Sequence, residues 1–279
     1  MDGGWRWRVS GPLNGCLVTG PGIASGSPGM SFVDRNDGWI LTTGGAAAGS
    51  AVYSVYRTRN GGATWSRVAY NTLQPNQPSR GNVPGCDCLG GISFRNRRTG
   101  WMTGSPSSME TELIFERTSD GGVTWRPQAL PLLGGFRQFD VSTASPSFFG
   151  ATGILPVGFV RPDAFVLYDS ADGGATWHAA TPIRGQPGSP FASADAFALD
   201  PAHVWAWIDR TLYQTSDGGR HWRRLARRLT VRGVPELQFL TPEVGYLLNE
   251  DPGGRGSPYL LETTDGGRTW RQVQTLLSR

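Results

Sequence analysis

The sequence contains no lysine, so all 26 basic residues of the 279-residue chain are arginines. Chemistry that requires an ε-amine, such as Schiff-base catalysis or phosphate binding by a P-loop, is therefore excluded. The formal charge of +4 favours anionic partners through long-range attraction. Most of the arginines alternate with acids along the chain, so nucleic acid is not the expected partner.

One short stretch departs from this even distribution of charge. Residues 220–228 contain five arginines: Arg220, Arg223, Arg224, Arg227 and Arg228. The favoured interpretation is a solvated strand edge, because charge on an edge discourages pairing with other sheets. The alternative is a surface for nucleic acid or another anionic polymer, which would bind with a steep salt dependence.

Cysteine and histidine are scarce, with three of each. Cys86 and Cys88 are too close for an ordinary bridge, so at most one disulfide forms, between Cys16 and one of them. A zinc site would need a fourth ligand and better spacing. The histidines lie in strand-like segments, where packed or surface positions are expected: His178, His203 and His221. We therefore expect no metal and no cofactor.

Long apolar runs are also missing. No segment approaches the roughly 20 apolar residues that span a bilayer, and the N-terminus lacks the apolar region of a signal peptide. Glycine (40) and proline (20) make the chain rich in turns, yet the apolar fraction is large enough for a core. Closed all-β repeats of this length form one unit, so residues 1–279 are predicted to be a single domain.

The chain does contain a repeated turn. Six segments match D/N-G-G-x-x-W, at residues 2–7, 60–65, 120–125, 172–177, 217–222 and 265–270. Their spacing of 45 to 60 residues is typical of propeller blades. The first and last residues of each copy are its structural positions: Asp2, Trp7, Asn60, Trp65, Asp120, Trp125, Asp172, Trp177, Asp217, Trp222, Asp265 and Trp270.

A second signature lies about 20 to 30 residues before most copies. It has the form of a strand, a tight turn and a strand, at residues 32–39, 94–101, 197–205 and 239–246. A third strand leads into each repeated turn, and its tryptophan opens a fourth. Four short antiparallel strands in each period predict one propeller blade.

The predicted fold is therefore an all-β propeller of four-stranded antiparallel blades. Five complete blades are expected at about 30–70, 91–130, 138–181, 193–229 and 235–277. The third lacks a clear Gly-Trp pair and carries a long Gly/Pro-containing stretch. The first turn, at Asp2, has no strand before it, so we interpret residues 1–10 as part of a sixth blade in a chain truncated at its N-terminus.

The chemistry of the repeated turn is structural. Adjacent glycines permit positive φ where the hairpin reverses, and the Asp or Asn accepts backbone N–H groups inside the turn. The tryptophan buries a large ring against a neighbouring strand. These carboxylates are therefore not expected to be catalytic.

These turns resemble the BNR or Asp-box repeats of sialidases, several other glycoside hydrolases, the sortilin ectodomain and photosystem II stability/assembly-factor-like propellers. The F-x-x-x-x-x-G-W element followed by T-S-D-G-G-x-T-W is most similar to the last group. The resemblance covers nearly the whole chain, from Ser31 to Leu276. It implies a WD40/YVTN-like scaffold. Relatives of this type often act outside the cytoplasm, so the resemblance also implies an extracytoplasmic location.

Geometry places the expected binding surface at the end of the blades opposite the Asp boxes, because the long uneven loops gather there. These loops include residues 44–50 and 156–163. The expected binding residues are loop arginines: Arg80, Arg137, Arg161, Arg184, Arg232 and Arg255. Candidate catalytic carboxylates are selected by exclusion alone: Asp87, Glu112, Asp163 and Glu250. The Arg-Ile-Pro element that a sialidase-like site would have is missing.

The first functional hypothesis is a non-enzymatic binding or assembly propeller that docks a protein or anionic partner on the loop-bearing end. The alternative is a glycoside hydrolase, sialidase-like or of another Asp-box family, or a carbohydrate-binding propeller. Hydrolysis of sugars by the purified chain would separate the two hypotheses.

Overall fold

The computed structural model describes twelve parts of the chain. They are residues 16–17, 29–47, 50–72, 78–85, 89–104, 113–136, 141–159, 164–184, 194–208, 211–225, 235–249 and 259–273. None of these residues is helical, and they include no helix long and apolar enough to cross a membrane.

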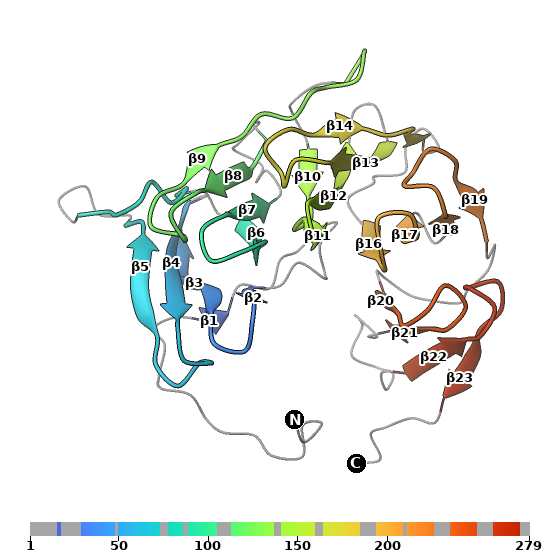
Figure 1. Ribbon diagram of the computed structural model, residues 1–279, viewed down its shortest axis with the longest axis horizontal. Coiled ribbons are helices and arrows are strands. Elements are labelled where there is room, and N and C mark those ends of the chain that lie inside the picture. The colour runs from blue at the N-terminus through green and yellow to red at the C-terminus, as the bar shows by residue number, and fades with distance from the viewer. Residues whose placement is uncertain are drawn as a thin grey trace.

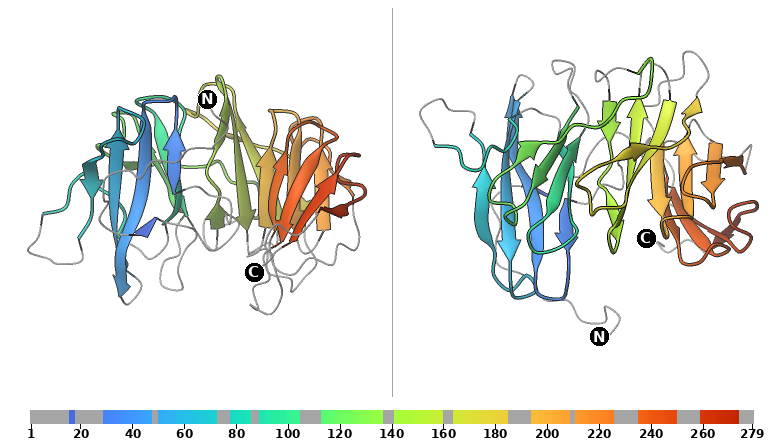
Figure 2. Two further views of the ribbon diagram at one scale, coloured as in Figure 1. Left: turned by 90° about the horizontal axis from the view of Figure 1, so that it is seen from below. Right: turned by 45° about the horizontal axis from the view of Figure 1, so that its top comes forward.

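Five antiparallel sheets follow one another around an arc (Figure 1). In each sheet the first strands lie toward the centre and the last strand lies at the rim, and Figure 2 shows the sheets standing side by side. This arrangement confirms the predicted propeller of four-stranded antiparallel blades. Residues 1–10, interpreted as part of a sixth blade, lie outside the described residues.

Blades 1 and 2 contain the first nine strands. In blade 1, two short pieces, β1 (Cys16–Leu17) and β2 (Met30–Phe32), both pair with β3, so together they occupy the innermost strand position. The remaining strands are β3 (Gly38–Ala47), β4 (Ser50–Thr58) and β5 (Ser66–Tyr70). Blade 2 consists of β6 (Leu89–Phe94), β7 (Gly100–Gly104), β8 (Phe115–Thr118) and β9 (Arg126–Pro127).

Blade 3 has interrupted first and last strands. Its long central pair is β12 (Thr152–Phe159) and β13 (Ala164–Ser170). Pro156 in β12 has no N–H to donate to the innermost strand, and that strand breaks beside it into β10 (Val141–Thr143) and β11 (Ser147–Phe149). The rim strand is divided into β14 (His178–Ala179) and β15 (Ile183–Arg184).

Blades 4 and 5 have four strands each. Blade 4 consists of β16 (Ala194–Ala198), β17 (Val204–Ile208), β18 (Thr211–Thr215) and β19 (Arg223–Arg224). Blade 5 consists of β20 (Glu236–Phe239), β21 (Gly245–Asn249), β22 (Tyr259–Thr263) and β23 (Arg271–Val273). Both arginines of β19 are exposed at the rim, whereas Arg227 and Arg228 of the same arginine-rich stretch lie outside the described residues.

Within the described parts of the chain, the core consists of four apolar layers, one between each pair of neighbouring blades. A repeated aromatic contact organises three of them. Trp39 of β3 stacks on Phe94 of β6 with ring centroids 3.7 Å apart, and Trp205 of β17 stacks on Phe239 of β20 at the same distance. Trp101 stacks on Phe148 at 4.7 Å. A tryptophan from one blade thus packs on the first-strand phenylalanine of the next blade.

Two of these tryptophans also bind the Asp box of the next blade, whereas Nε1 of Trp101 donates to Oε1 of Gln128 at 2.8 Å. Nε1 of Trp39 donates to the carbonyl of Gly121 at 2.8 Å, and Nε1 of Trp205 donates to the carbonyl of Gly266 at 3.0 Å. These hydrogen bonds satisfy a buried indole N–H and fix the register of one blade against the next.

The strand-turn-strand segments fold as hairpins, as predicted. In blades 1, 2 and 5 a phenylalanine pairs with a glycine across the hairpin, for example Phe94 with Gly100. The phenylalanine ring lies over the glycine, and a Cβ on Gly100 would come within 2.6 Å of it. Glycine is therefore required there by the ring above it.

Three details differ from the sequence prediction. In blade 4 the hairpin has the same register, but the phenylalanine, Phe197, lies one residue earlier, and Ala198 and Val204 take the places of the usual phenylalanine and glycine. The predicted loop 44–50 is largely strand, since β3 continues to Ala47 and β4 starts at Ser50. Likewise, residues 156–159 of the predicted loop 156–163 belong to β12. Blade 3 lacks the Gly-Trp pair, as the sequence predicts, because Gly153 takes the hairpin glycine's place and Ile154 follows it instead of tryptophan.

Candidate functional site

The Asp boxes and the first hairpin of each blade lie at one end of the blades, here called the Asp-box face. The second residue of each described box donates its N–H to the hairpin loop of the same blade, as Gly61 does to Asn36 at 2.9 Å and Gly121 does to Arg98 at 2.8 Å. The same bond recurs in blades 3, 4 and 5. The two kinds of turn therefore share an end, as the sequence predicted.

The sequence predicts a binding surface at the opposite end of the blades. Of the arginines expected there, Arg137, Arg161, Arg232 and Arg255 lie outside the described residues, and so do the carboxylates Asp87, Glu112, Asp163 and Glu250. Arg80 is exposed and its backbone pairs with Tyr70. Arg184 is exposed in β15, with its guanidinium 5.7 Å from the centroid of the Phe136 ring. The role of these two arginines in binding stays a prediction.

The box carboxylates are held by hydrogen bonds within their own turns. Asp120 accepts the hydroxyl protons of Thr118 at 2.8 Å and Thr124 at 2.6 Å, and the backbone N–H of Thr124 at 2.9 Å. In blade 5 the hydroxyl and backbone N–H of Thr269 lower the pKa of Asp265 to about 2. These acids are fixed in the ionised form. Asp2 and Trp7 of the first box lie outside the described residues.

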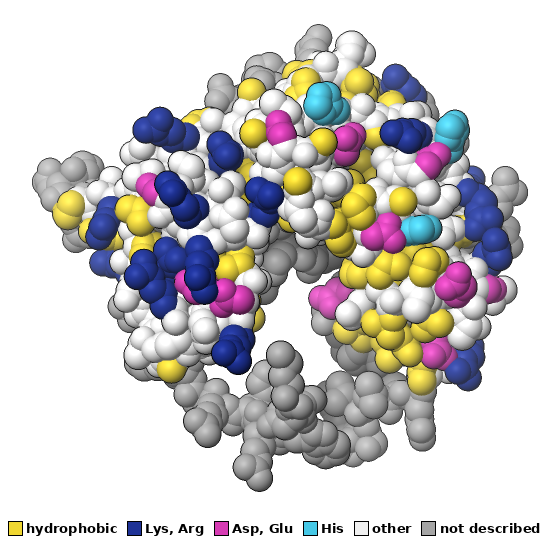
Figure 3. Space-filling model, in the orientation of Figure 1, with side chains coloured by type: hydrophobic (Ala, Val, Ile, Leu, Met, Phe, Trp, Pro, Cys, Tyr) yellow, Lys and Arg dark blue, Asp and Glu magenta, His cyan; other side chains and the backbone are white. Residues whose placement is uncertain are grey.

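The charges on the Asp-box face are unevenly distributed (Figure 3). The hairpins and boxes of blades 1 and 2, together with the residue before each box, contain five arginines and three aspartates. The corresponding turns of blades 4 and 5 contain two arginines, two histidines and four carboxylates. One half of the face is therefore basic and the other half acidic.

The basic half is here called the arginine cluster, defined as Arg35, Arg59, Arg95, Arg97 and Arg98. Arg97 forms ion pairs with Asp34 at 3.0 Å and Asp37 at 2.8 Å. In the part of the chain that the structure describes, the other four arginines have no carboxylate partner. Their charges are available to an anionic partner.

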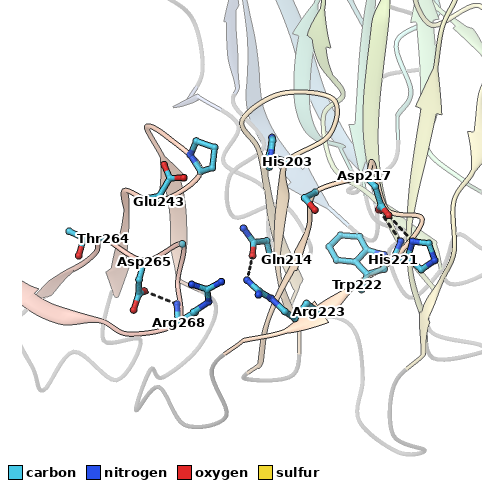
Figure 4. A pocket seen from close by; sticks show the side chains of 13 residues that line it. His203, Gln214, Asp217, His221, Trp222, Arg223, Glu243, Thr264, Asp265 and Arg268 are labelled. Atoms are coloured by element: carbon cyan, nitrogen blue, oxygen red, sulfur yellow. Dashed lines mark hydrogen bonds and ion pairs between the residues drawn. The ribbon is translucent and has the colours of Figure 1, made fainter.

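A groove of about 630 Å³ lies between blades 4 and 5 on the acidic half (Figure 4). His203 and Glu243 lie at one end and Arg223 and Arg268 at the other, with Gln214 between them. The ring nitrogen Nδ1 of His203 lies 2.8 Å from Oδ2 of Asp200. Burial acts to raise the pKa of Asp200, but hydrogen bonds from the backbone and ring of His203 hold it below its usual value. The groove is polar, and it combines acidic, basic and amide groups.

Neither the groove nor the arginine cluster was predicted from the sequence. Their residues lie in the hairpin loops and boxes, which were interpreted as structural turns. Aligning the five hairpin loops by position would have shown the change from basic to acidic residues along the chain. Among the described residues, no group of three or more His, Cys, Asp or Glu side chains is arranged to hold a metal ion.

Known proteins share this architecture. A xyloglucanase from Paenibacillus sp is 26% identical over 230 residues, which cover 73% of this chain and 21% of the enzyme. The chain thus spans about a fifth of the length of that relative. A sialidase structure from Trypanosoma rangeli matches with 13% identity and a TM-score of 0.53, over 92% of this chain and 47% of the sialidase. That likeness shows a common propeller fold.

A structure described as YCF48 bound to D1 peptide is 20% identical to this chain, with a TM-score of 0.39, and the match covers 95% of this chain and 84% of that one. A family model provides the assignment, because the model of the photosynthesis system II assembly factor YCF48 matches residues 82–233, more than half of the chain. The resemblance inferred from the hairpin and Asp-box motifs is confirmed: the chain belongs to the YCF48 family of photosynthesis system II assembly factors.

Proposed function

We propose that the chain is a non-enzymatic propeller that docks a protein partner during the assembly of a larger complex. The observation that carries the proposal is the family model, whose family is named for an assembly factor. The matched residues 82–233 include Arg95, Arg97 and Arg98 of the arginine cluster. In this proposal, the cluster contacts an acidic segment of the partner.

The charges of the described residues support this choice of surface. Arg35 lies in the hairpin of blade 1, Arg59 directly precedes the adjacent Asp box, and both arginines are exposed. Neither has a carboxylate partner among the residues that the structure describes. Exposed charges without an ion-pair partner attract an oppositely charged partner and so accelerate association. These charges stay hydrated until the partner binds.

The loop-bearing opposite end remains a second surface for the same kind of partner. Arg80 and Arg184 belong to the set predicted there, and both are exposed. They therefore offer a charge-matched control for the arginine cluster.

The test is a titration of the purified chain with a fluorescein-labelled peptide of alternating Glu and Gly in 50 mM NaCl. The double variant Arg35→Glu/Arg59→Glu should bind at least about tenfold more weakly, because two attractive contacts become repulsive. The matched variant Arg80→Glu/Arg184→Glu should stay within about twofold of the unmodified chain. A larger loss in the second variant would move docking to the opposite end, and equal affinities in all three proteins would contradict the proposal.

The xyloglucanase relative supports glycoside hydrolysis as the second candidate function. Incubation with xyloglucan oligosaccharides and aryl glycosides tests it directly. Turnover that is lost in Glu112→Gln or Asp163→Asn would replace the binding proposal with an enzymatic one. We expect no turnover.

A further inference from the structure

The junction between blades 1 and 2 shows how arginine fills the space between two hairpins. Arg97 extends from the hairpin of blade 2 to Asp34 and Asp37 in the hairpin of blade 1. Arg57 of β4 donates to the other oxygen of Asp37 at 3.1 Å, and its guanidinium lies 4.8 Å from the centroid of the Trp39 ring. Two guanidinium groups and two carboxylates therefore occupy this junction.

The junction between blades 4 and 5 has equivalent backbone positions, but several of these positions carry different side chains. The strand registers and the hairpin hydrogen bonds align Asp34 with Asp200, because each accepts the N–H groups two and three residues later. By the same registers, Gln214 pairs with Trp205 as Arg57 pairs with Trp39.

The remaining positions follow from the hairpin loops, which are five residues long in each of these blades. His203 corresponds to Asp37, and Pro242 corresponds to Arg97. Both arginines of the first junction are thus replaced, while one of its two carboxylates is kept.

The groove between blades 4 and 5 corresponds to the space that Arg57 and Arg97 fill between blades 1 and 2. His203, Gln214 and Pro242 all line it. A Cβ on Gly121 would lie 2.6 Å from Nη1 of Arg57, whereas a Cβ on the corresponding Gly266 finds no side-chain atom nearer than Nε2 of Gln214 at 3.7 Å. Asp200 is 40% exposed, close to the 38% of Asp34. Oδ2 of Asp200 already contacts Nδ1 of His203 at 2.8 Å, and the exposed carboxylate keeps a further lone pair for a second donor.

We propose that this groove binds a guanidinium group, presented by an arginine of a protein partner. The guanidinium would enter at the end formed by His203, Pro242 and Glu243 (Figure 4) and pair with Asp200 as Arg97 pairs with Asp34. Arginine fits this site because its planar fork donates several hydrogen bonds at once to carboxylates. The choice of a protein as the source of the arginine rests on the proposed function, but the groove is separate from the arginine cluster.

The other charges of the groove set the orientation of the ligand. Arg223 and Arg268 lie at the far end (Figure 4), where Arg223 donates to Oε1 of Gln214 at 2.8 Å. They repel a guanidinium from that end and attract a carboxylate. The four carboxylates in the adjacent turns outnumber the two arginines of the same turns. A peptide that carries an acidic residue beside its arginine would therefore match both ends of the groove.

The experiment compares two probe peptides on the full chain, one with the sequence Ser-Gly-Arg-Asp-Gly-Ser and one with citrulline in place of arginine. Binding is followed at pH 7.5 and 20 mM NaCl through the NMR signals of the Gln214 side-chain amide and the Trp222 indole N–H. The citrulline peptide keeps the shape but loses the charge, so it should bind at least about tenfold more weakly. Equal binding of both peptides, or no binding of either at 10 mM, would overturn the proposal.

Two variants and a control locate the site. Pro242→Arg supplies the missing guanidinium from the chain itself, so it should raise the Tm and prevent binding of the arginine peptide. Asp200→Asn keeps the backbone hydrogen bonds of the loop, as Asn96 does in blade 2, and should weaken binding at least about tenfold. Leu132→Arg adds the same charge at an exposed position in the 113–136 segment and should leave binding unchanged. If Pro242→Arg and Leu132→Arg behave alike, the groove is not the site.

These results are independent of the arginine cluster. Failure of the acidic peptide to bind would remove the proposed function of the basic half, while the arginine peptide reports on the groove alone. Binding of the arginine peptide with no effect of Arg35→Glu/Arg59→Glu on the acidic peptide would support the groove and contradict the cluster.

Discussion

At the scale of single residues, the environment of a carboxylate decides how it affects stability. Glu116 on β8 is only 9% exposed, and burial raises its pKa to about 7. No hydrogen bond or ion pair of this side chain compensates its burial among the described residues. Asp265 is the opposite case, because hydrogen bonds lower its pKa to about 2.

The raised pKa of Glu116 predicts a loss of stability as the pH rises. Below the ordinary glutamate pKa of about 4.5 the side chain is neutral in both the folded and unfolded states, so burial costs least there. Between that pH and about 7, the unfolded chain releases the proton first, and folding becomes less favourable. Glu116→Gln should therefore raise the free energy of unfolding at pH 8 by about 1–3 kcal/mol and have little effect at pH 4.

Chemical denaturation at pH 4, 6 and 8 measures this effect. Glu236→Gln is the control, because Glu236 is an exposed residue of β20. A variant at Glu116 that gave the same gain at every pH would show that packing, and not ionisation, limits stability at this position.

At the scale of an element, the cost of replacing the hairpin glycine depends on how freely the phenylalanine ring above it can move. Phe94 lies between Trp39, at 3.7 Å, and Trp125, at 5.9 Å, and is only 7% exposed. Phe32 in blade 1 contacts Trp65 edge-on at 6.0 Å and is 41% exposed. The two hairpins have the same register but differ in how far the phenylalanine can move.

This difference predicts unequal effects of one substitution. A Cβ would meet the ring at 2.5 Å in Gly38→Ala and at 2.6 Å in Gly100→Ala. Phe32 can turn toward solvent, so Gly38→Ala should cost less than about 1 kcal/mol, whereas Gly100→Ala should cost about 2–3 kcal/mol through overpacking. Urea denaturation of both variants provides the comparison. Equal losses in the two proteins would mean that the ring over Gly38 is held as tightly as the one over Gly100.

The elements could be predicted from the sequence because their signals are local. The Gly-Gly pair of each Asp box requires positive φ, as at Gly121 and Gly122, and the hairpins follow from strand patterns on both sides of a short turn. In blade 4, Phe197 lies one residue before the usual position of the hairpin phenylalanine. The sequence pattern did not show this, because the pairing of Ala198 with Val204 is defined only in the folded hairpin. The groove was missed because it arises from two replaced arginines, Arg57 by Gln214 and Arg97 by Pro242. These positions meet only when neighbouring blades pack together.

At the scale of the whole molecule, the stability of each blade depends on how many neighbours it has. Blade 3 packs between blades 2 and 4, and six of the seven residues of β13 are buried. Among the residues that the structure describes, blade 5 shares one apolar layer, with blade 4, and four of the five residues of β22 are only partly buried. In repeat proteins such interfaces contribute much of the stability of each unit, so the described blades should not open together.

Hydrogen exchange of this chain should therefore be graded along the arc. Amides in β21 and β22 should exchange at least about tenfold faster than those in β12 and β13, because blade 5 can open locally while blade 3 is released by more extensive unfolding. Phe239→Ala removes the ring that stacks on Trp205 at 3.7 Å, and it should accelerate exchange in blade 5 without changing blade 3. Under conditions where exchange reports on opening equilibria, identical protection in all blades would instead show that the arc unfolds as one cooperative unit. The interfaces would then couple the blades more strongly than their partial burial at blade 5 suggests.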